Sequence, residues 1–428
     1  MGKDEITYIN LKNKIKLIYV KKNIDYLIAC VSILAGSNLE NEKNYGIAHC
    51  VEHILFSNKI KNSTIMTELN KIGAIFNATT SHDQTNYYIM FDKKNVNLII
   101  EALYTIYVEN NFDIENLEKE KKIIKEEFNI SNGSTNTMLY HKIIEDFYGK
   151  DKILNIMPIG DMDIIKNIKK KDIIDYKKFY VPELTSIILI GNYSETILNS
   201  FIGKFSKIPN NPSILKIVEK SKLYFKKNDK SIFYLSFFPK TKTNVDINII
   251  FKIKNYKPHI VEFIIIFLNN VILFKKLRID NGFTYSSNAS TINIGESTLL
   301  KISCSCEIQY LIKVIDIIKK ILYDLGNTEL TDKEYEITLN KIIMIYNIEF
   351  KSPNGYLNWY KNLTKKPINE IYSPDEHLNK IKSTKKKDIK NTSNNLFNLN
   401  NSKIYITGKE LTKEESPLIH IVYSTFYK

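Results

Sequence analysis

Apolar residues follow the same order of patterns in the two halves of the chain. Alternating or short continuous apolar runs predict strands, and apolar residues that recur every three or four positions predict helices. In the first half these patterns predict strands over Ile15–Leu34, a helix over Ile47–Phe56, a strand over Ile75–Met90, and helices over Lys94–Val108 and Ile114–Asn129. In the second half they predict strands over Ser231–Phe237 and Val245–Ile253, a helix over Val261–Leu277, strands over Thr284–Ile308, and helices over Tyr310–Leu325 and Asp332–Glu349.

Two pairs of segments relate the halves at a nearly constant offset. Asp113-Ile114-Glu115 opens one long helix, and Asp332-Lys333-Glu334 opens its counterpart 219 positions later (113 to 332). The strand at 187–191 is similar to the strand at 404–408, 217 positions later (187 to 404). An offset kept over such a distance indicates an internal duplication. The predicted fold class is therefore α+β, with two homologous α/β-sandwich domains, each a mostly antiparallel sheet covered by helices.

A polar stretch separates the two predicted domains. Ile208–Leu215 contains two prolines and is typical of a linker. We expect an N-terminal domain over residues 1–209 and a homologous C-terminal domain over residues 216–428. With 428 residues the chain is too long for one ordinary core, which also favours two domains.

Composition narrows the class of protein. A hydrophobic content of 43% with 25% charged residues is typical of a soluble globular chain. Apolar runs such as Val261–Leu268 are far shorter than a membrane span, and the first residues lack the apolar stretch of a signal peptide. We expect a cytoplasmic protein with no membrane association. The formal net charge is +14, but the lysines are dispersed among Asn, Ile and Asp, so we expect no nucleic-acid partner.

Four cysteines are too few for a disulfide framework in so long a chain. Cys304 and Cys306 lie two positions apart in a predicted strand and point to the same face, where no further Cys or His completes a metal site. We interpret them as a packed thiol pair. The sequence leaves open whether this pair or Cys50 has a redox role.

The predicted helix 47–56 contains the pattern H-x-x-E-H. On a helix His49 and His53 share one face, with Glu52 beside them. Two imidazoles one turn apart can bind one tetrahedral zinc ion at about 2.0–2.1 Å. The carboxylate then lies near the open position of the metal, where a water molecule would bind. The alternative is a pair of partly buried histidines that form hydrogen bonds with their neighbours.

A second helix offers the third ligand. Over 118–128 the residues Glu120, Ile123, Ile124 and Glu127 recur at helical spacing and predict a core-facing stripe with a carboxylate at each end. Buried carboxylates are costly unless a cation compensates them. Glu118 and Glu126 fall on other faces and are expected in solvent. The alternative is an amphipathic face with both acids at its rim.

These segments resemble the inverted zinc motif of the pitrilysin, insulin-degrading enzyme and mitochondrial-processing-peptidase family. The resemblance extends over most of the chain. It is carried by the helix 46–56 together with Ala35-Gly36-Ser37, Glu40-Asn41-Glu42, Gly73–Ala78, Thr85–Tyr88, Glu118–Glu127, Pro158-Ile159-Gly160 and Tyr180-Val181-Pro182. The sequence departs from the family pattern at Cys50 and at Ser57-Asn58, and neither departure removes a ligand.

The resemblance implies a role for each matching residue. His49, His53 and Glu127 are implied as ligands of one Zn²⁺ per chain, with Glu120 as the acid that supports the metal site. Glu52 is implied as the general base that activates the zinc-bound water. Asn77 and Ala78 match the edge-strand positions that pair with an extended peptide substrate.

A solitary arginine marks a second candidate site. Arg278 is the single Arg among 61 Lys and Arg residues. The segment that runs from Leu277-Arg278 to Tyr285 resembles the C-terminal Arg/Tyr motif of the family, which implies that Arg278 and Tyr285 bind substrate and act at the reacting centre. The alternative is one arginine retained by chance in a lysine-rich chain. No H-x-x-E-H occurs in the second half, so we expect that domain to contribute substrate contacts and no zinc site.

The function expected is that of a zinc metalloendopeptidase that hydrolyses unfolded or extended peptides, working as a homodimer. Three alternatives stay open. These are a processing-peptidase subunit active only as a heterodimer with an inactive homologue, a non-catalytic scaffold subunit of the same family, and a basic nucleic-acid-binding protein.

Overall fold

The computed structural model describes residues 5–132, 134–149, 157–220, 231–238, 242–253, 257–294 and 297–428. The contacts divide the chain into two compact units. Unit 1 comprises Met1–Leu223 and Glu349–Ser373, and unit 2 comprises Tyr224–Ile348 and Pro374–Lys428. A segment from the second half of the sequence therefore packs with the first unit. The linear division at residues 209–216 stays a prediction.

Unit 1 contains a six-stranded sheet in the order β1-β2-β8-β3-β7-β6. Only β2 and β8 run parallel, and the other neighbouring pairs are antiparallel. The strands are β1 (Glu5–Asn10), β2 (Lys16–Lys21), β3 (Tyr26–Ile33), β6 (Ile75–Thr80), β7 (Thr85–Asp92) and β8 (Thr185–Gly191). A separate two-stranded ribbon consists of β4 (Lys59–Ile60) and β5 (Ser63–Thr64).

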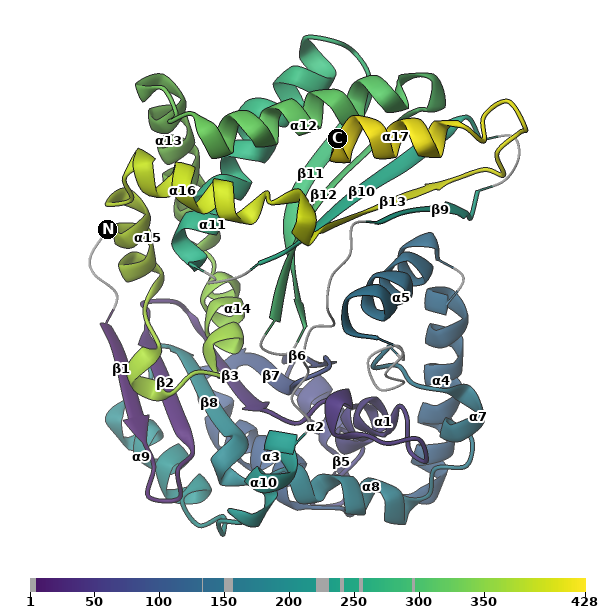
Figure 1. Ribbon diagram of the computed structural model, residues 1–428. Helices are drawn as coiled ribbons and strands as arrows, with labels where there is room; N and C mark the ends of the chain where they lie inside the picture. The colour runs from purple at the N-terminus through teal and green to yellow at the C-terminus, as the bar shows by residue number, and fades with distance from the viewer. Residues whose placement is uncertain are drawn as a thin grey trace. The chain divides into compact units, whose positions relative to one another are not determined.

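Apart from α5 (Thr135–Tyr148), the helices from the first half of the chain contribute to a buried core on one face of this sheet (Figure 1). They are α1 (Ile47–Leu55), α2 (Ile65–Lys71), α3 (Val96–Val108), α4 (Ile114–Asn132), α7 (Met162–Ile165), α8 (Lys170–Tyr176), α9 (Glu195–Phe205) and α10 (Ser213–Lys220). Alternate strand residues such as Val31, Ile89 and Leu189 are fully buried against them. This burial on one face follows from the period of two along each strand.

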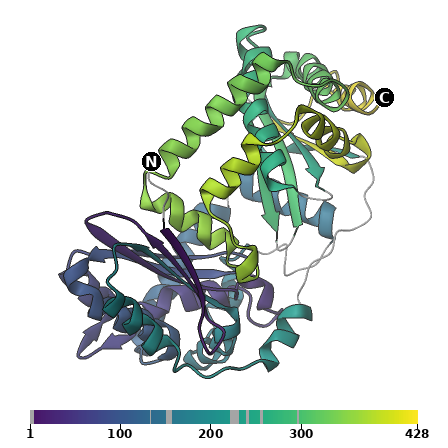
Figure 2. The same cartoon turned by 90° about the vertical axis from the view of Figure 1, so that its left-hand side faces the viewer.

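The opposite face of the same sheet is covered by α14 (Pro353–Leu363), which belongs to the second half of the sequence (Figure 2). A buried cluster joins Tyr356, Leu357, Tyr360 and Leu363 of the helix to Ile18, Val20, Ile28, Cys30, Ile188 and Ile190 of the sheet. The central strands are thus apolar on both faces. This explains why β8 reads as a continuous apolar run rather than an alternation.

Unit 2 contains a five-stranded sheet in the order β11-β12-β10-β13-β9, in which only β13 and β9 run parallel. The strands are β9 (Ser231–Ser236), β10 (Asn244–Lys252), β11 (Thr284–Ile294), β12 (Ser297–Glu307) and β13 (Ser402–Gly408). The helices are α11 (Pro258–Phe267), α12 (Leu311–Asn327), α13 (Asp332–Glu349), α15 (Pro374–Lys382), α16 (Lys386–Leu396) and α17 (Leu418–Tyr427).

The two sheets share one topology. Read from its other edge, the sheet of unit 1 has the order β6-β7-β3-β8-β2, which matches β11-β12-β10-β13-β9 strand by strand, including the single parallel pair at the end. The matching strands β8 and β13 begin 217 positions apart (185 to 402), the offset found in the sequence. The predicted α+β fold with a duplicated, mostly antiparallel sheet is confirmed.

One predicted element differs in kind. The helix predicted over Val261–Leu277 is α-helical only to Phe267, and two π-helical segments follow, Leu268–Ile272 and Phe274–Ile279. Apolar spacing does not distinguish a π-helical turn from an α-helical one, and such turns are frequent at functional sites. The strand run predicted over Thr284–Ile308 contains residues 295 and 296, which lie outside the described residues. Among the described residues, no helix combines the length and apolar character needed to cross a lipid bilayer.

Candidate metal centre

Helix α1 presents the candidate ligands from a buried position. Its apolar residues, among them Ile47, Val51 and Ile54, are fully buried and pack the helix against the core of unit 1. His49 and His53 lie one turn apart on the remaining face, with their ring centroids 4.6 Å apart. The helix therefore holds both imidazoles on one side, as the spacing predicts.

The N-terminus of α1 is fixed by a buried carboxylate. Glu40 accepts hydrogen bonds from the backbone N–H groups of Gly46 (2.8 Å) and Ala48 (2.9 Å). These are donors that a helix leaves unsatisfied in its first turn. Gly46 has φ 93°, and a Cβ at Gly46 or at Gly160 would overlap the other glycine. The Pro158-Ile159-Gly160 segment thus packs directly against the start of the helix.

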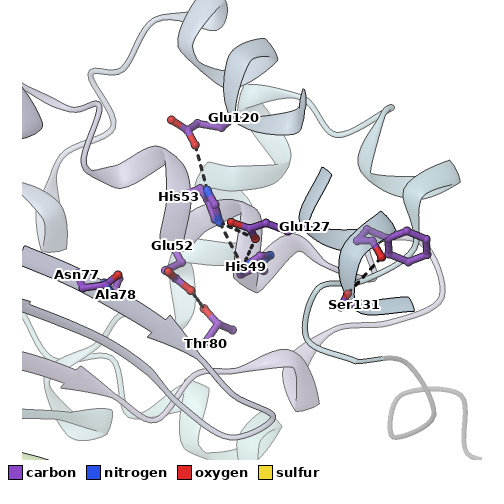
Figure 3. Close-up of polar contacts among 10 residues, drawn as sticks. His49, Glu52, His53, Asn77, Ala78, Thr80, Glu120, Glu127 and Ser131 are labelled. Atoms are coloured by element: carbon purple, nitrogen blue, oxygen red, sulfur yellow. Dashed lines mark hydrogen bonds and ion pairs between the residues drawn. The ribbon is translucent and has the colours of Figure 1, made fainter. Parts of the chain in front are cut away.

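Three ligand atoms converge between α1 and α4. The Nε2 atoms of His49 and His53 lie 3.2 Å apart, and Oε2 of Glu127 lies 3.7 Å from the first and 3.6 Å from the second (Figure 3). Ligand atoms of a tetrahedral zinc ion are roughly 3.3 Å apart when each bond is about 2.0–2.1 Å. These three residues form the single group of His, Cys, Asp and Glu side chains within the described residues that is compact enough to hold a metal ion. The donor set and its spacing fit zinc.

Glu120 fixes the ring of His53. The Nδ1 atom of His53 lies 3.0 Å from Oε2 of Glu120 (Figure 3). In the neutral ring with its proton on Nδ1, this hydrogen bond leaves Nε2 free to bind a metal beside Glu127. Burial alone would lower the pKa of His53, but the hydrogen bond with Glu120 and the nearby Glu52 and Glu127 carboxylates raise it. Burial, together with the proximity of His53, lowers the pKa of His49 to about 3. His49 is therefore a neutral imidazole at physiological pH, as a metal ligand must be.

The stripe predicted on α4 is correct except for one residue. Ile124 is fully buried and Glu120 and Glu127 are half-buried, whereas Ile123 is 48% exposed. Ile123 lies about 100° around the helix from Ile124, so the two cannot both face the centre of a narrow contact. Glu126 is exposed, as its helical phase predicts. The two acids on the stripe point toward the histidines of α1.

Glu52 is buried on α1 and contacts the strand β6. The residue is 9% exposed, and its Oε2 accepts a hydrogen bond of 2.6 Å from the hydroxyl of Thr80, the last residue of β6 (Figure 3). Burial raises the pKa of Glu52 above its ordinary value, although the hydrogen bond with Thr80 opposes this effect. A carboxyl group whose pKa is raised toward neutrality is suited to general base catalysis.

Strand β6, which carries Asn77 and Ala78, is the edge of the sheet. Within the described residues it pairs only with β7, and the other side of its backbone has no neighbouring strand. Asn77 is exposed, and its Oδ1 accepts a hydrogen bond of 2.8 Å from the backbone N–H of Ala78. An open edge of this kind can pair with an extended peptide.

The turn that follows β6 is held on several sides. The ring of His82 forms hydrogen bonds of 2.9 Å with the hydroxyl groups of Ser37 and Tyr140. Lys365 forms an ion pair with Asp83, and the hydroxyl of Thr364 donates to Oε1 of Gln84 over 3.3 Å. The segment after α14 therefore contacts the turn that connects β6 to β7.

Arg278 and Tyr285 lie together in unit 2. The guanidinium of Arg278 donates from one terminal nitrogen to the backbone oxygen of Tyr285 over 2.9 Å, and its carbon lies 4.7 Å from the centre of the Tyr285 ring. The same carbon lies 5.3 Å from the centre of the ring of Phe274, which belongs to the second π-helical segment. Tyr285 is 80% exposed. The pair is thus assembled as one exposed group on unit 2.

All four cysteines are free and buried. Burial raises the pKa of Cys50 and of Cys306 to about 12, and it raises that of Cys304 as well. Because the thiolate is the reactive form, burial of this kind disfavours redox chemistry at these positions.

Glu40 and Thr80 were not predicted as residues of the site. In the sequence, Glu40-Asn41-Glu42 contributes only to the resemblance to the family. The contact of Glu40 with α1 depends on how the loop before that helix folds. A signal for Thr80 was present, because Ala78 and Thr80 are two apart in a predicted strand and therefore share the face that Ala78 turns inward.

Comparison with known families yields two consecutive matches. The family model described as insulinase (peptidase family M16) matches residues 20–157, and the model described as the peptidase M16 inactive domain matches residues 167–342. The first match contains the three candidate ligands and Glu52, and the second contains Arg278 and Tyr285.

Individual relatives agree with these matches. The β subunit of the rat mitochondrial-processing peptidase is 30% identical over 168 residues, which cover 39% of this chain and only 34% of that protein. A protein of Rickettsia felis named as an uncharacterized zinc protease is 22% identical over 408 residues, 92% of this chain and 96% of its own length. The crystal structure of a protease from Helicobacter pylori covers 95% of this chain with a TM-score of 0.79 at 17% identity, which shows that the fold is shared.

Proposed function

Because the chain belongs to peptidase family M16, the insulinase family, we propose that it is a zinc metalloendopeptidase that hydrolyses unfolded or extended peptides. The convergence of His49, His53 and Glu127, with Glu52 on the same helix as the histidines, is the observation that carries this proposal. A family member without catalytic activity would have no need to keep this set of side chains within ligand distance. This argument speaks against the scaffold alternative.

His49, His53 and Glu127 would hold one zinc ion per chain, and Glu120 would keep the ring of His53 in the ligating orientation. When bound, the ion would lower the pKa of a water molecule to about 7 and polarise the scissile carbonyl. Glu52 would accept the proton of the attacking water and pass it to the leaving amine. Its burial supports this role, since it raises the pKa of the carboxyl.

The substrate would bind along β6 by strand addition near Asn77 and Ala78. The open edge of β6 supports this placement, because a peptide backbone can form hydrogen bonds with the N–H and C=O groups of β6 that do not pair with β7. A folded protein cannot offer a free extended strand, so unstructured peptides are the expected substrates. The roles of Arg278 and Tyr285 in substrate binding and in stabilising the oxyanion stay predictions that rest on the resemblance and on their joint exposure in unit 2.

A homodimer is the proposed assembly, and a heterodimer with an inactive homologue is the second candidate. The relatives named as β subunits of mitochondrial-processing peptidases keep the second candidate open. Sedimentation of the protein purified alone, with peptidase activity measured on the same sample, separates the two. Activity in a self-associated sample supports the homodimer, and activity that requires a second chain supports the heterodimer.

Metal analysis and digestion of a peptide library test the proposed function. We expect about one zinc per chain, cleavage of unstructured peptides and loss of cleavage with phenanthroline. Glu52→Gln should keep its zinc and lose roughly 10²- to 10⁴-fold in turnover, the usual contribution of a general base. Near-normal turnover in this variant would contradict the mechanism. Purified protein that lacks zinc and cleaves no peptide would contradict the proposal and favour the non-catalytic scaffold alternative.

A further inference from the structure

Thr80 connects the general base to the strand that is proposed to bind substrate. It is the last residue of β6, two positions after Ala78, and its hydroxyl donates to Oε2 of Glu52 over 2.6 Å (Figure 3). We propose that Thr80 is a positioning residue of the peptidase reaction, which fixes the carboxylate of Glu52 and couples its orientation to the edge strand. This inference rests on the proposed function.

The hydrogen bond restricts the one motion that would misalign the base. A glutamate side chain in a helix can rotate about its terminal bonds, and the terminal torsion is broad. With Oε2 held by the hydroxyl, the second carboxylate oxygen keeps one orientation. Burial of Glu52 strengthens the bond, because a hydrogen bond is stronger in surroundings of low dielectric constant than in bulk water.

Thr80 is itself held in place by the turn that follows it. The backbone N–H of Ser37 donates to the oxygen of Ser81 over 3.2 Å, and that of Asn38 donates to the oxygen of His82 over 2.7 Å. On the other side, Lys365 pairs with Asp83. The hydroxyl therefore points at Glu52 from a rigid support, which is what precise positioning of a catalytic group requires.

Thr80→Val is the decisive variant, because valine keeps the shape of threonine and removes the donor. We expect kcat to fall roughly 10- to 100-fold, because the Glu52 carboxylate loses a hydrogen bond that orients it while it accepts the proton of the attacking water. KM should stay within about twofold, because the bond does not involve bound substrate. Zinc content should match that of the unaltered protein, and the melting temperature should fall by only a few degrees, because one buried carboxylate oxygen loses its donor. Thr80→Ser restores the hydroxyl and should restore most of kcat.

Thr196→Val is the control. Thr196 is exposed in α9, which contributes no residue to the proposed site. The same change of chemistry at this position should leave kcat unaltered. If Thr80→Val does not fold, Thr80→Ala takes its place in the comparison.

Glu52→Gln, measured alongside, separates failure of this inference from failure of the proposed function. If Glu52→Gln is inactive while Thr80→Val turns over within about twofold of the unaltered protein, the positioning role is refuted and the peptidase mechanism stands. Loss of zinc in Thr80→Val, or failure of Thr80→Ser to recover activity, would show a merely structural role and would also refute it. Full activity of Glu52→Gln would show that Glu52 is not the general base. The proposed role of Thr80 would then be refuted as well.

Discussion

At the scale of single residues, the metal centre distinguishes two adjacent glutamates of α4. Glu127→Gln should weaken zinc binding by roughly 100-fold or more, since the loss of even an outer partner of a metal ligand costs about 10- to 100-fold. Glu126→Gln is the matched control, because Glu126 is exposed and lies on another face of the helix. Zinc competition with a chelator measures both variants. Equal loss in the two would contradict the assignment of Glu127.

A second residue-scale prediction concerns Arg278. Arg278→Lys keeps the charge but loses the planar group that lies over the Tyr285 ring and donates to its backbone oxygen. We expect kcat/KM to fall by about 10²-fold, the cost of a positioning error of about 1 Å. Zinc content and melting temperature should not change. Lys275→Arg in the same segment is the control, and an unchanged kcat/KM in Arg278→Lys would make the lone arginine an accident of codon usage.

His82 should contribute to the loss of stability in acid. Burial, with a smaller contribution from His141, lowers its pKa to about 4, although the nearby Asp83 opposes the shift. An unfolded histidine titrates near pH 6.5, so between about pH 6.5 and pH 4 the unfolded chain binds the extra proton. The free energy of unfolding should therefore decrease as the pH falls through this window, by at most about 1.4 kcal/mol per pH unit from this group.

Denaturant unfolding of the protein and of His82→Gln, each at pH 7 and at pH 5, measures this contribution. The variant should start from a lower stability at pH 7, because the hydrogen bonds to Ser37 and Tyr140 are altered. It should then lose less stability than the unaltered protein on going to pH 5. Parallel losses in the two proteins would show that other groups account for the pH dependence.

At the scale of elements, α1 depends on a loop carboxylate for its position. Glu40→Ala leaves the N–H groups of Gly46 and Ala48 buried without an acceptor, which should cost about 1–3 kcal/mol in the free energy of unfolding. Because the same helix carries both histidines, zinc affinity should fall as well. The exposed Glu42 offers the control Glu42→Ala, for which neither effect is expected. A Glu40→Ala variant that melts early but binds zinc normally would show that the cap does not align the ligands.

At the scale of the whole molecule, the first unit cannot be complete without the segment Glu349–Ser373. A fragment of residues 1–223 leaves one apolar face of its sheet without α14, including Ile18, Ile28 and Ile188. Large exposed apolar patches favour association and aggregation. We expect this fragment to be poorly soluble and to bind hydrophobic dyes. A peptide of residues 349–373 supplied during refolding should raise its solubility and melting temperature, whereas a scrambled peptide should not. A fragment that folds cooperatively without the peptide would contradict this dependence.

Much of this protein follows from its sequence. The helix with His49, Glu52 and His53, the phase of Glu120 and Glu127 on α4, and the duplicated order of elements are all local or periodic features. Such features are set by 3.6-residue and 2-residue repeats, which the sequence displays directly. The pairing of His49 and His53 on α1 can be predicted without knowledge of the fold, because one helical turn places both rings on one side of the helix.

Other features were decided only by the tertiary structure. The exposure of Ile123, the two π-helical segments before Arg278, and the contacts of Glu40 and Thr80 depend on which elements pack together. The clearest case is α14, which follows α13 in sequence yet covers the sheet of unit 1. An amphipathic helix shows in its sequence that it has an apolar face, but not which sheet will bury that face. That choice is made by shape and by long-range contacts such as those of Tyr360 with the strands of the first unit.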